Sequence, residues 1–243
     1  MTKETVLQQC TVEGTTIKLP DAQLDRKLYM EVAKSLELIG GKWKGGKISG
    51  FVFPNDPTDL LSQIANGEKR NLKKEFQFFA TPKELARKIV AIANPAPYDE
   101  ILEPSAGQGA IVEAINAYCS PDIVYCFELM PLNQSFLTEI PNATIIGKDF
   151  LEECTRNFDQ IIANPPFSKN QDIDHIRKMY ECLKEGGRMA SIASKHWQIS
   201  SNKKETDFRE WLNDVGAEII DVEAGEFKES GTNIATCIIA INK

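Results

Sequence analysis

The chain has 243 residues, of which 42% are hydrophobic and 26% charged, enough for one α/β domain and a small extra module. No apolar run of about 18 residues exists, which argues against a membrane span, and no signal-peptide core follows Met1. The net charge of −7 argues against non-specific coating of nucleic acid, and the six scattered cysteines, without zinc spacing, indicate reduced thiols, no metal site and a cytoplasmic protein.

The first 75 residues are expected to form a small α/β module followed by a linker. Hydrophobic spacing and Gly turns predict a strand at 15–19, a helix at 21–38, a hairpin at 43–53, a helix at 57–65 and a polar linker at 66–75. The hairpin sequence from Lys42 to Lys47 combines basic residues with Trp43, which would suit contact with a phosphate and a base. We favour the alternative, a solvated turn with Trp43 packed inward.

Charge is uneven along the chain. Residues 1–79 carry 12 Lys and Arg against 10 Asp and Glu, whereas residues 80–243 carry 16 against 25. Any broad phosphate contact is therefore expected in the N-terminal part or in local patches.

Residues 76–243 are expected to form the main domain. Short apolar runs of β type alternate with helical segments, at 101–103, 123–127, 144–146, 160–163, 189–193, 218–222 and 235–241. This alternation predicts an α/β fold with a mostly parallel, doubly wound sheet. The last two runs are joined without a helical pattern, so we expect one antiparallel strand.

A glycine-rich turn follows the first of these strands. In an open α/β sheet, ligands bind beyond the carboxyl ends of the strands, where Gly107 and Gly109 permit a tight turn and close backbone approach. The turn matches neither G-x-G-x-x-G nor a P-loop. The alternative is a strand-to-helix turn without a ligand.

Acidic residues follow the next two strands. Glu128 lies about 20 residues beyond the glycines, where a carboxylate can accept both ribose hydroxyls. Asp149 can accept from an adenine amino group, and Phe150 can cover the ring; a turn aspartate and a core phenylalanine are the alternative. Upstream, Thr81 is predicted to cap a helix that begins at Pro82, with Glu84 completing a capping box.

The strongest signal is Asn164-Pro165-Pro166-Phe167 after the fourth strand. The two prolines hold the backbone rigid. The side-chain carbonyl of Asn164 and the Asn164–Pro165 peptide oxygen are two acceptors that can clamp one amino group. Phe167 can stack on a planar target. A rigid Pro-Pro loop with a turn asparagine is the alternative.

The succession T-P, E-P-S-A-G-Q-G, F-E-L, D-F and N-P-P-F resembles the class I S-adenosylmethionine-dependent methyltransferases that modify adenine N6 in DNA. The resemblance covers residues 77–243 and implies a Rossmann-like seven-stranded sheet with a reversed last strand. It implies that the cofactor is held by Thr81, Glu103, Pro104, Ser105, Ala106, Gly107, Gly109, Glu128, Asp149, Phe150 and Asn164. It also implies that Asn164 to Phe167 grip the target, with Phe227 as a second wall.

The chain departs from this family in having no large recognition domain after the final strand. Either target recognition is minimal, or the N-terminal module, a partner protein or a homodimer supplies it. The module faintly resembles short segments that precede methylases in phage-type proteins. Lys195, after the fifth strand, is expected on the substrate side.

DNA is the first choice of partner. The same motif would serve methylation of RNA or of a protein glutamine, since each target is a planar amino group. A noncatalytic subunit of a larger complex and a nicotinamide oxidoreductase are more distant alternatives.

Overall fold

The computed structural model describes residues 1–76, 78–223 and 234–243. By its internal contacts the chain divides into two compact units, Met1–Phe78 and Phe79–Lys243. Within the described ranges, no helix is both long and apolar enough to cross a bilayer.

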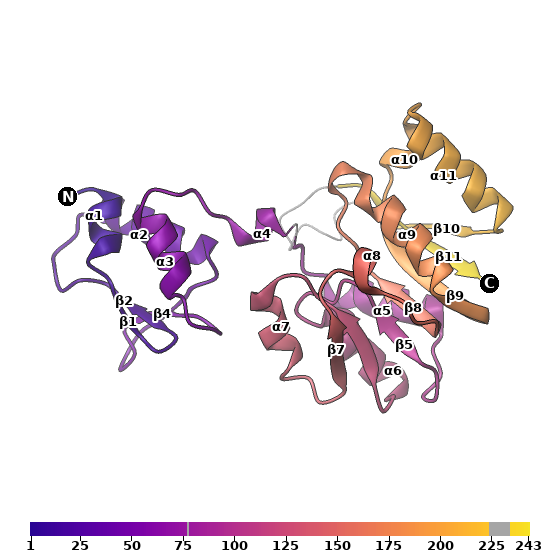
Figure 1. The fold of residues 1–243 in the computed structure, drawn as a ribbon, viewed down its shortest axis with the longest axis horizontal. Coiled ribbons are helices and arrows are strands. Elements are labelled where there is room, and N and C mark those ends of the chain that lie inside the picture. Colours follow the sequence, from indigo (N-terminus) through magenta and orange to yellow (C-terminus); the bar gives the residue numbers. More distant parts are fainter. Residues whose placement is uncertain (77, 224–233) are drawn as a thin grey trace. The chain divides into compact units, whose positions relative to one another are not determined.

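The first unit is a four-stranded antiparallel sheet with helices (Figure 1). Its elements are α1 (Lys3–Gln8), β1 (Thr11–Glu13), β2 (Thr16–Lys18), α2 (Arg26–Leu38), β3 (Lys42–Lys44), β4 (Gly50–Val52) and α3 (Thr58–Ala65). The strand order is β1-β2-β4-β3. The predicted hairpin and two helices are present, whereas α1, β1 and a short helix α4 (Leu72–Glu75) in the linker were not predicted.

The preferred expectation for Trp43 was wrong. Its side chain is 43% exposed and makes an edge contact with Phe51, with 5.2 Å between ring centroids. The reason is that β3 is the outermost strand of this sheet and only three residues long. A strand in that position packs against a neighbour on one side only.

The second unit is a seven-stranded sheet, and the predicted fold is confirmed. Its strands are β5 (Ile101–Glu103), β6 (Val124–Phe127), β7 (Ala143–Gly147), β8 (Phe158–Ala163), β9 (Leu183–Ser194), β10 (Glu218–Asp221) and β11 (Thr236–Asn242). The order is β10-β11-β9-β8-β5-β6-β7. The pairs among β5 to β9 are parallel, while β11 runs antiparallel to both β9 and β10.

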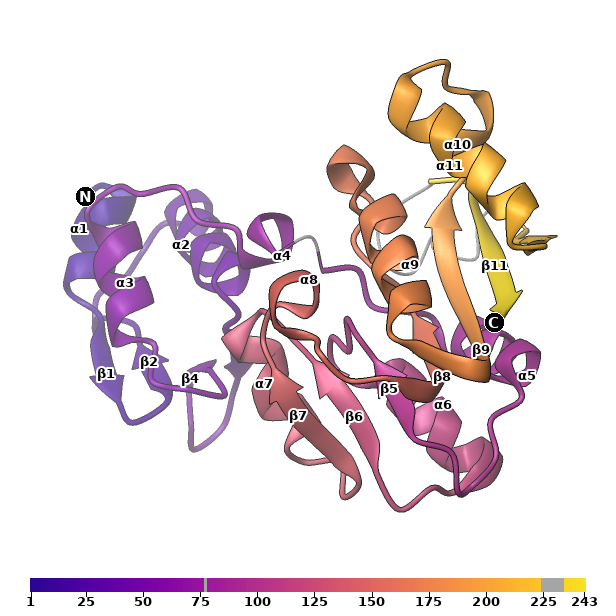
Figure 2. The ribbon, with the colours of Figure 1, turned by 45° about the vertical axis from the view of Figure 1, so that its right-hand side comes forward.

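Helices cover the two faces of this sheet (Figure 2). They are α5 (Lys83–Ala93), α6 (Ala110–Cys119), α7 (Pro131–Leu137), α8 (Phe150–Glu153), α9 (Gln171–Glu181), α10 (His196–Ile199) and α11 (Lys203–Asp214). Consecutive residues of β8 show the two faces: Ile162 packs with α5 and α6, and Ile161 packs with α9 and α11. Side chains alternate across a strand, so one apolar run serves both cores.

Candidate functional site

The predicted site residues follow strands that are neighbours in the sheet. β5 pairs in parallel with both β6 and β8, with Glu103 opposite Cys126 and Leu102 opposite Ile161. The carboxyl ends of these strands therefore lie at one edge of the sheet. This edge is where ligands bind in open α/β folds.

The glycine turn after β5 requires glycine at position 109. Gly109 has φ +85° and is the N-cap residue of α6. A Cβ atom there would lie 2.2 Å from Ile140 Cδ1, closer than atoms can approach. Pro104 and Ala106 are buried and Ser105 is half-buried. The turn thus presents mainly backbone to its surroundings.

Glu128, just after β6, is hydrogen-bonded to this turn. Its Oε2 accepts from the Gly107 N–H at 2.7 Å, and its Oε1 accepts from the Met130 N–H at 2.7 Å and from Asn133 Nδ2 at 3.3 Å. Burial raises the pKa of this carboxyl, and the N–H groups of Met130 and Gly107 oppose the shift. The carboxylate is therefore held in a fixed orientation at the edge of the sheet.

Glu103 supplies a second buried carboxyl group at the end of β5. Its side chain is 2% exposed, and Oε2 has no hydrogen-bond partner among the described residues. Burial, and then the charge of Glu128, raise the pKa of Glu103 well above its ordinary value. A protonated Glu103 could donate to an acceptor on a bound ligand.

Asn164 is oriented by Thr81. Asn164 Nδ2 donates to Thr81 Oγ1 at 3.0 Å, while Asn164 Oδ1 is buried and without a partner in the described part of the chain. A buried acceptor that lacks a donor is costly, by about 1–3 kcal/mol. An orphan of this kind marks a position where a ligand amino group would restore the missing hydrogen bond.

The capping role expected for Thr81 was wrong. Helix α5 begins at Lys83, and its N-cap position is occupied by Pro82 without a side-chain cap. Glu84 pairs instead with Arg87. The hydroxyl of Thr81 is used in the contact with Asn164, across 83 positions of sequence, which local patterns do not reveal.

The two prolines and Phe167 continue the loop from Asn164. Pro165 is buried, and Pro166 and Phe167 are half-buried. Phe167 packs against the core on the side of α5 and α6. Part of this ring is therefore available to a planar target.

Asp149 and Phe150 occupy structural positions. Asp149 caps α8 by accepting from the Leu151 N–H at 3.0 Å. Phe150 is 2% exposed and contacts Phe127 and His175. The alternative named for this pair, a turn aspartate and a core phenylalanine, describes this geometry, and little of the Phe150 ring is open to a ligand.

Of the remaining two predicted residues, only Lys195 is described by the structure. Lys195 forms an ion pair with Asp221, with 2.7 Å between Nζ and Oδ1. Phe227 lies outside the described residues.

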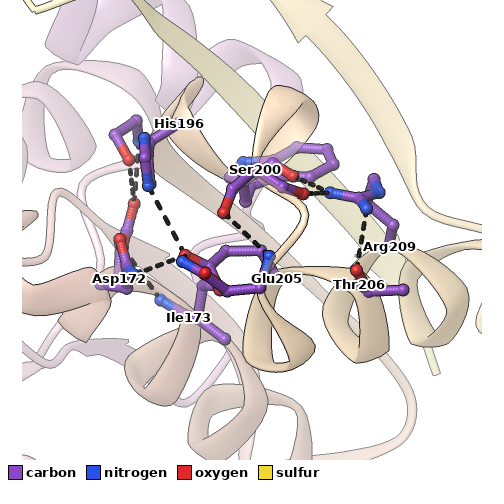
Figure 3. A network of polar contacts seen from close by, with 11 residues as sticks. Asp172, Ile173, His196, Ser200, Glu205, Thr206 and Arg209 are labelled. Carbon is purple, nitrogen blue, oxygen red and sulfur yellow. Dashed lines mark hydrogen bonds and ion pairs between the residues drawn. The ribbon is translucent and has the colours of Figure 1, made fainter.

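Two buried carboxylates that the sequence interpretation missed hold the segment after Phe167 (Figure 3). Asp172, 1% exposed, accepts from the N–H of Ser194 at 2.9 Å and from its hydroxyl at 2.8 Å. Glu205, also 1% exposed, accepts from Asn170 Nδ2 at 2.8 Å and faces His196 Nε2 at 3.5 Å. The spacing of Asn202 and Glu205 before an apolar helix face is typical of a capping box and could have drawn attention to Glu205.

Known proteins share this architecture. Residues 129–215 match the family model described as "Methyltransferase small domain". A search of curated protein sequences found no match.

Solved structures give the same result at low sequence identity. A type I restriction-modification methyltransferase subunit from Streptococcus thermophilus aligns with a TM-score of 0.59 and 22% identity over 77% of this chain and 48% of that one. TrmN from Thermus thermophilus aligns with a TM-score of 0.52 and 18% identity over 72% and 54%. A putative RNA methyltransferase from Pyrococcus horikoshii aligns with a TM-score of 0.54 and 16% identity over 88% and 98%.

The second unit therefore has the fold of the class I methyltransferases, as the sequence resemblance implied. One further structure of this fold is described as a putative class I S-adenosylmethionine-dependent methyltransferase from Listeria monocytogenes. The chain spans about half the length of the first two of these structures, 48% and 54%. At identities below 25%, the similarity to these structures establishes a shared fold and nothing further.

Proposed function

We propose that this chain transfers a methyl group from S-adenosylmethionine to the N6 amino group of adenine in DNA. The observation that carries the proposal is the orphaned, buried Asn164 Oδ1, whose amide is oriented by Thr81. The acceptor follows a strand that is the direct neighbour of the glycine-turn strand. This arrangement supports a binding point for an amino group at the same edge as the proposed cofactor residues.

The residues present fit the cofactor. The glycine turn offers close backbone approach, since a side chain at position 109 would clash with Ile140. Glu128 Oε2 accepts only the Gly107 N–H among the described residues, at 2.7 Å, and retains a lone pair for a ribose hydroxyl, whereas Oε1 already accepts from the Met130 N–H and from Asn133 Nδ2. Thr81, Glu103 to Gly107 and Asp149 complete the proposed cofactor set. When bound, S-adenosylmethionine supplies an electrophilic methyl group.

The chain's own contribution to the reaction is mainly positional. Asn164 Oδ1 and the Asn164–Pro165 peptide oxygen accept the two amino hydrogens, so the nitrogen lone pair is directed away from both oxygens. As nitrogen gains positive charge, the same two oxygens stabilise it. The surplus proton leaves afterwards to water. A duplex substrate would need its adenine flipped out to reach this point, and Phe167 would stack on it.

The choice of DNA is supported by a likeness of fold and by the motif order from Thr81 to Phe167. One similar structure is described as a type I restriction-modification methyltransferase subunit, and a partner subunit would then supply target recognition. The chain is also similar in fold to TrmN and to the putative RNA methyltransferase, so methylation of an RNA base is the second candidate function.

Incubation of the chain with tritiated S-adenosylmethionine tests the substrate. Parallel reactions contain duplex DNA, total RNA or a protein mixture, followed by nucleoside and amino-acid analysis. The proposal predicts label in N6-methyladenine from DNA. Label only in RNA or glutamine would overturn the choice of DNA, and cofactor binding without label in any arm would favour a noncatalytic subunit.

A further inference from the structure

The N-terminal module carries an open groove between α2 and the β3–β4 hairpin. Its volume is about 880 Å³. The lining residues that could contact a ligand include Arg26, Lys27, Met30, Lys34, Trp43 and Phe51. All of them belong to the module, so this groove is a feature of the first unit by itself.

Large apolar side chains are exposed at this groove. Met30 is 59% exposed and Trp43 is 43% exposed. The described part of the module exposes four large apolar side chains, and the other two are Met1 and Ile48. Clustered exposed apolar surface marks interaction sites more often than scattered residues do. Phe51, 1% exposed, makes a T-shaped contact with the indole of Trp43, and this contact restrains the indole, so less side-chain entropy is lost when a ligand stacks on it.

Three positive and two negative side chains line the groove. Arg26, Lys27 and Lys34 are exposed and form no ion pair within the described residues, against two acids, Glu31 and Glu37. Arg26, Met30 and Lys34 follow one another at four-residue spacing and therefore form one stripe along α2. Beyond the groove, the hairpin adds the exposed Lys44 and Lys47.

We infer that this groove binds a nucleic-acid strand with unpaired bases. A base would stack on the indole of Trp43, and the neighbouring phosphates would contact Arg26, Lys27 and Lys34. An aromatic platform flanked by cations is the arrangement by which proteins hold single strands without sequence preference. An acidic peptide would satisfy the cations but would leave the aromatic face unused.

The inference deepens the proposed function and rests on it for the choice of nucleic acid as ligand. It would give the chain a second contact with its substrate, in the unit that carries net charge +2, whereas residues 80–243 carry −9. Attraction to phosphate is electrostatic and falls with salt. The less acidic unit is therefore the better place for this contact.

Fluorescence anisotropy of the full chain with a labelled 20-nucleotide single-stranded oligodeoxynucleotide at low salt tests the inference. We expect Trp43→Ala and the double variant Lys27→Glu/Lys34→Glu each to weaken binding at least tenfold, and Trp43→Phe to restore most of it. Lys69→Glu is the control: it reverses one exposed charge in the same unit, outside the groove, and should change affinity less than threefold. The double variant should also reduce the salt dependence, by about 0.7 in slope for each lost contact.

Equal effects of the groove and control variants would overturn the inference. So would binding of poly-glutamate as tight as that of the oligonucleotide, or a concentration-dependent dimer that Trp43→Ala abolishes. Cofactor affinity, measured by calorimetry on the same proteins, separates the two proposals. If the oligonucleotide binds through the groove but the cofactor does not bind, the result contradicts the methyltransferase function and still supports nucleic-acid binding by the groove.

Discussion

Thr81 Oγ1 accepts a hydrogen bond from Asn164 Nδ2 at 3.0 Å, and Asn164 Oδ1 is left buried with no partner among the described residues. The hydroxyl is thus the partner of the amide nitrogen, and the amide oxygen is the end left for a ligand. If the free oxygen is the acceptor for the target amino group, Thr81 controls the chemistry through Asn164.

Thr81→Val should slow methyl transfer because it keeps the shape of the side chain and removes the acceptor. We expect turnover to fall about tenfold, the equivalent of one hydrogen bond of roughly 1–1.5 kcal/mol. Thr81→Ser keeps the hydroxyl and should stay within about twofold of the original rate. Single-turnover kinetics with saturating cofactor measure the effect; equal rates for the valine and serine variants would contradict this role.

Gly109→Ala should destabilise the second unit and weaken cofactor binding. The substitution combines left-handed strain with a clash against Ile140, for a total of about 2–4 kcal/mol. Gly186→Ala is the matched control because Gly186 also has a positive φ, +76°, but no atom lies within 4 Å of its Cβ position. Urea denaturation should show the larger loss at position 109, and calorimetry should show weaker cofactor binding only there.

Glu205→Ala should disorder the segment after Phe167 because it removes the acceptor of Asn170 Nδ2. Lys169 and Asn170 both have φ of +57°, a strained geometry that needs support from its surroundings. We expect a higher KM for the target with nearly unchanged cofactor affinity. Glu205→Gln, which retains an acceptor, should recover most of the effect.

Glu210→Ala is the control for that experiment, since Glu210 lies exposed on the same helix. An equal rise in KM for the Glu205 and Glu210 variants would show that Glu205 has no special part in the site.

Glu103 should make stability depend on pH. Burial raises the pKa of Glu103 well above its ordinary value of 4.5, so the folded state retains a proton that the unfolded state loses. Its contribution to stability is full below about pH 4.5 and is lost as the pH rises toward the folded-state pKa. Glu103→Gln should remove this part of the pH dependence. Urea denaturation between pH 5 and 8 checks it, and identical slopes for the two proteins would contradict it.

The sequence predicted the second unit well because its strands are short apolar runs separated by helices. Each of the seven runs corresponds to a strand, and Ile101–Glu103 matches to the residue. β9 was underestimated because its first residues, Leu183 to Arg188, are mostly polar and glycine-rich. Within this stretch only Leu183 and Arg188 pair with β8, and only Arg188 pairs with β11, so its assignment to the strand depends on tertiary pairing at its two ends rather than on local preference.

The site was harder to predict where a contact joins distant parts of the chain. Gly107 and Glu128 are 21 residues apart and were expected to lie together from fold rules alone. Thr81 and Asn164 are 83 apart, and the local capping pattern pointed Thr81 to a different role. Trp43 was misjudged because the position of β3 at the sheet edge depends on pairing order, which hydrophobic spacing does not determine.

The most direct measurement compares methyl transfer and cofactor binding in Asn164→Ala. If Asn164 Oδ1 holds the target amino group, turnover should fall by about a hundredfold or more, while calorimetry should give a cofactor dissociation constant within about threefold of the original. Retention of most of the turnover, or equal losses of rate and cofactor affinity, would contradict the role of Asn164 on which this account depends.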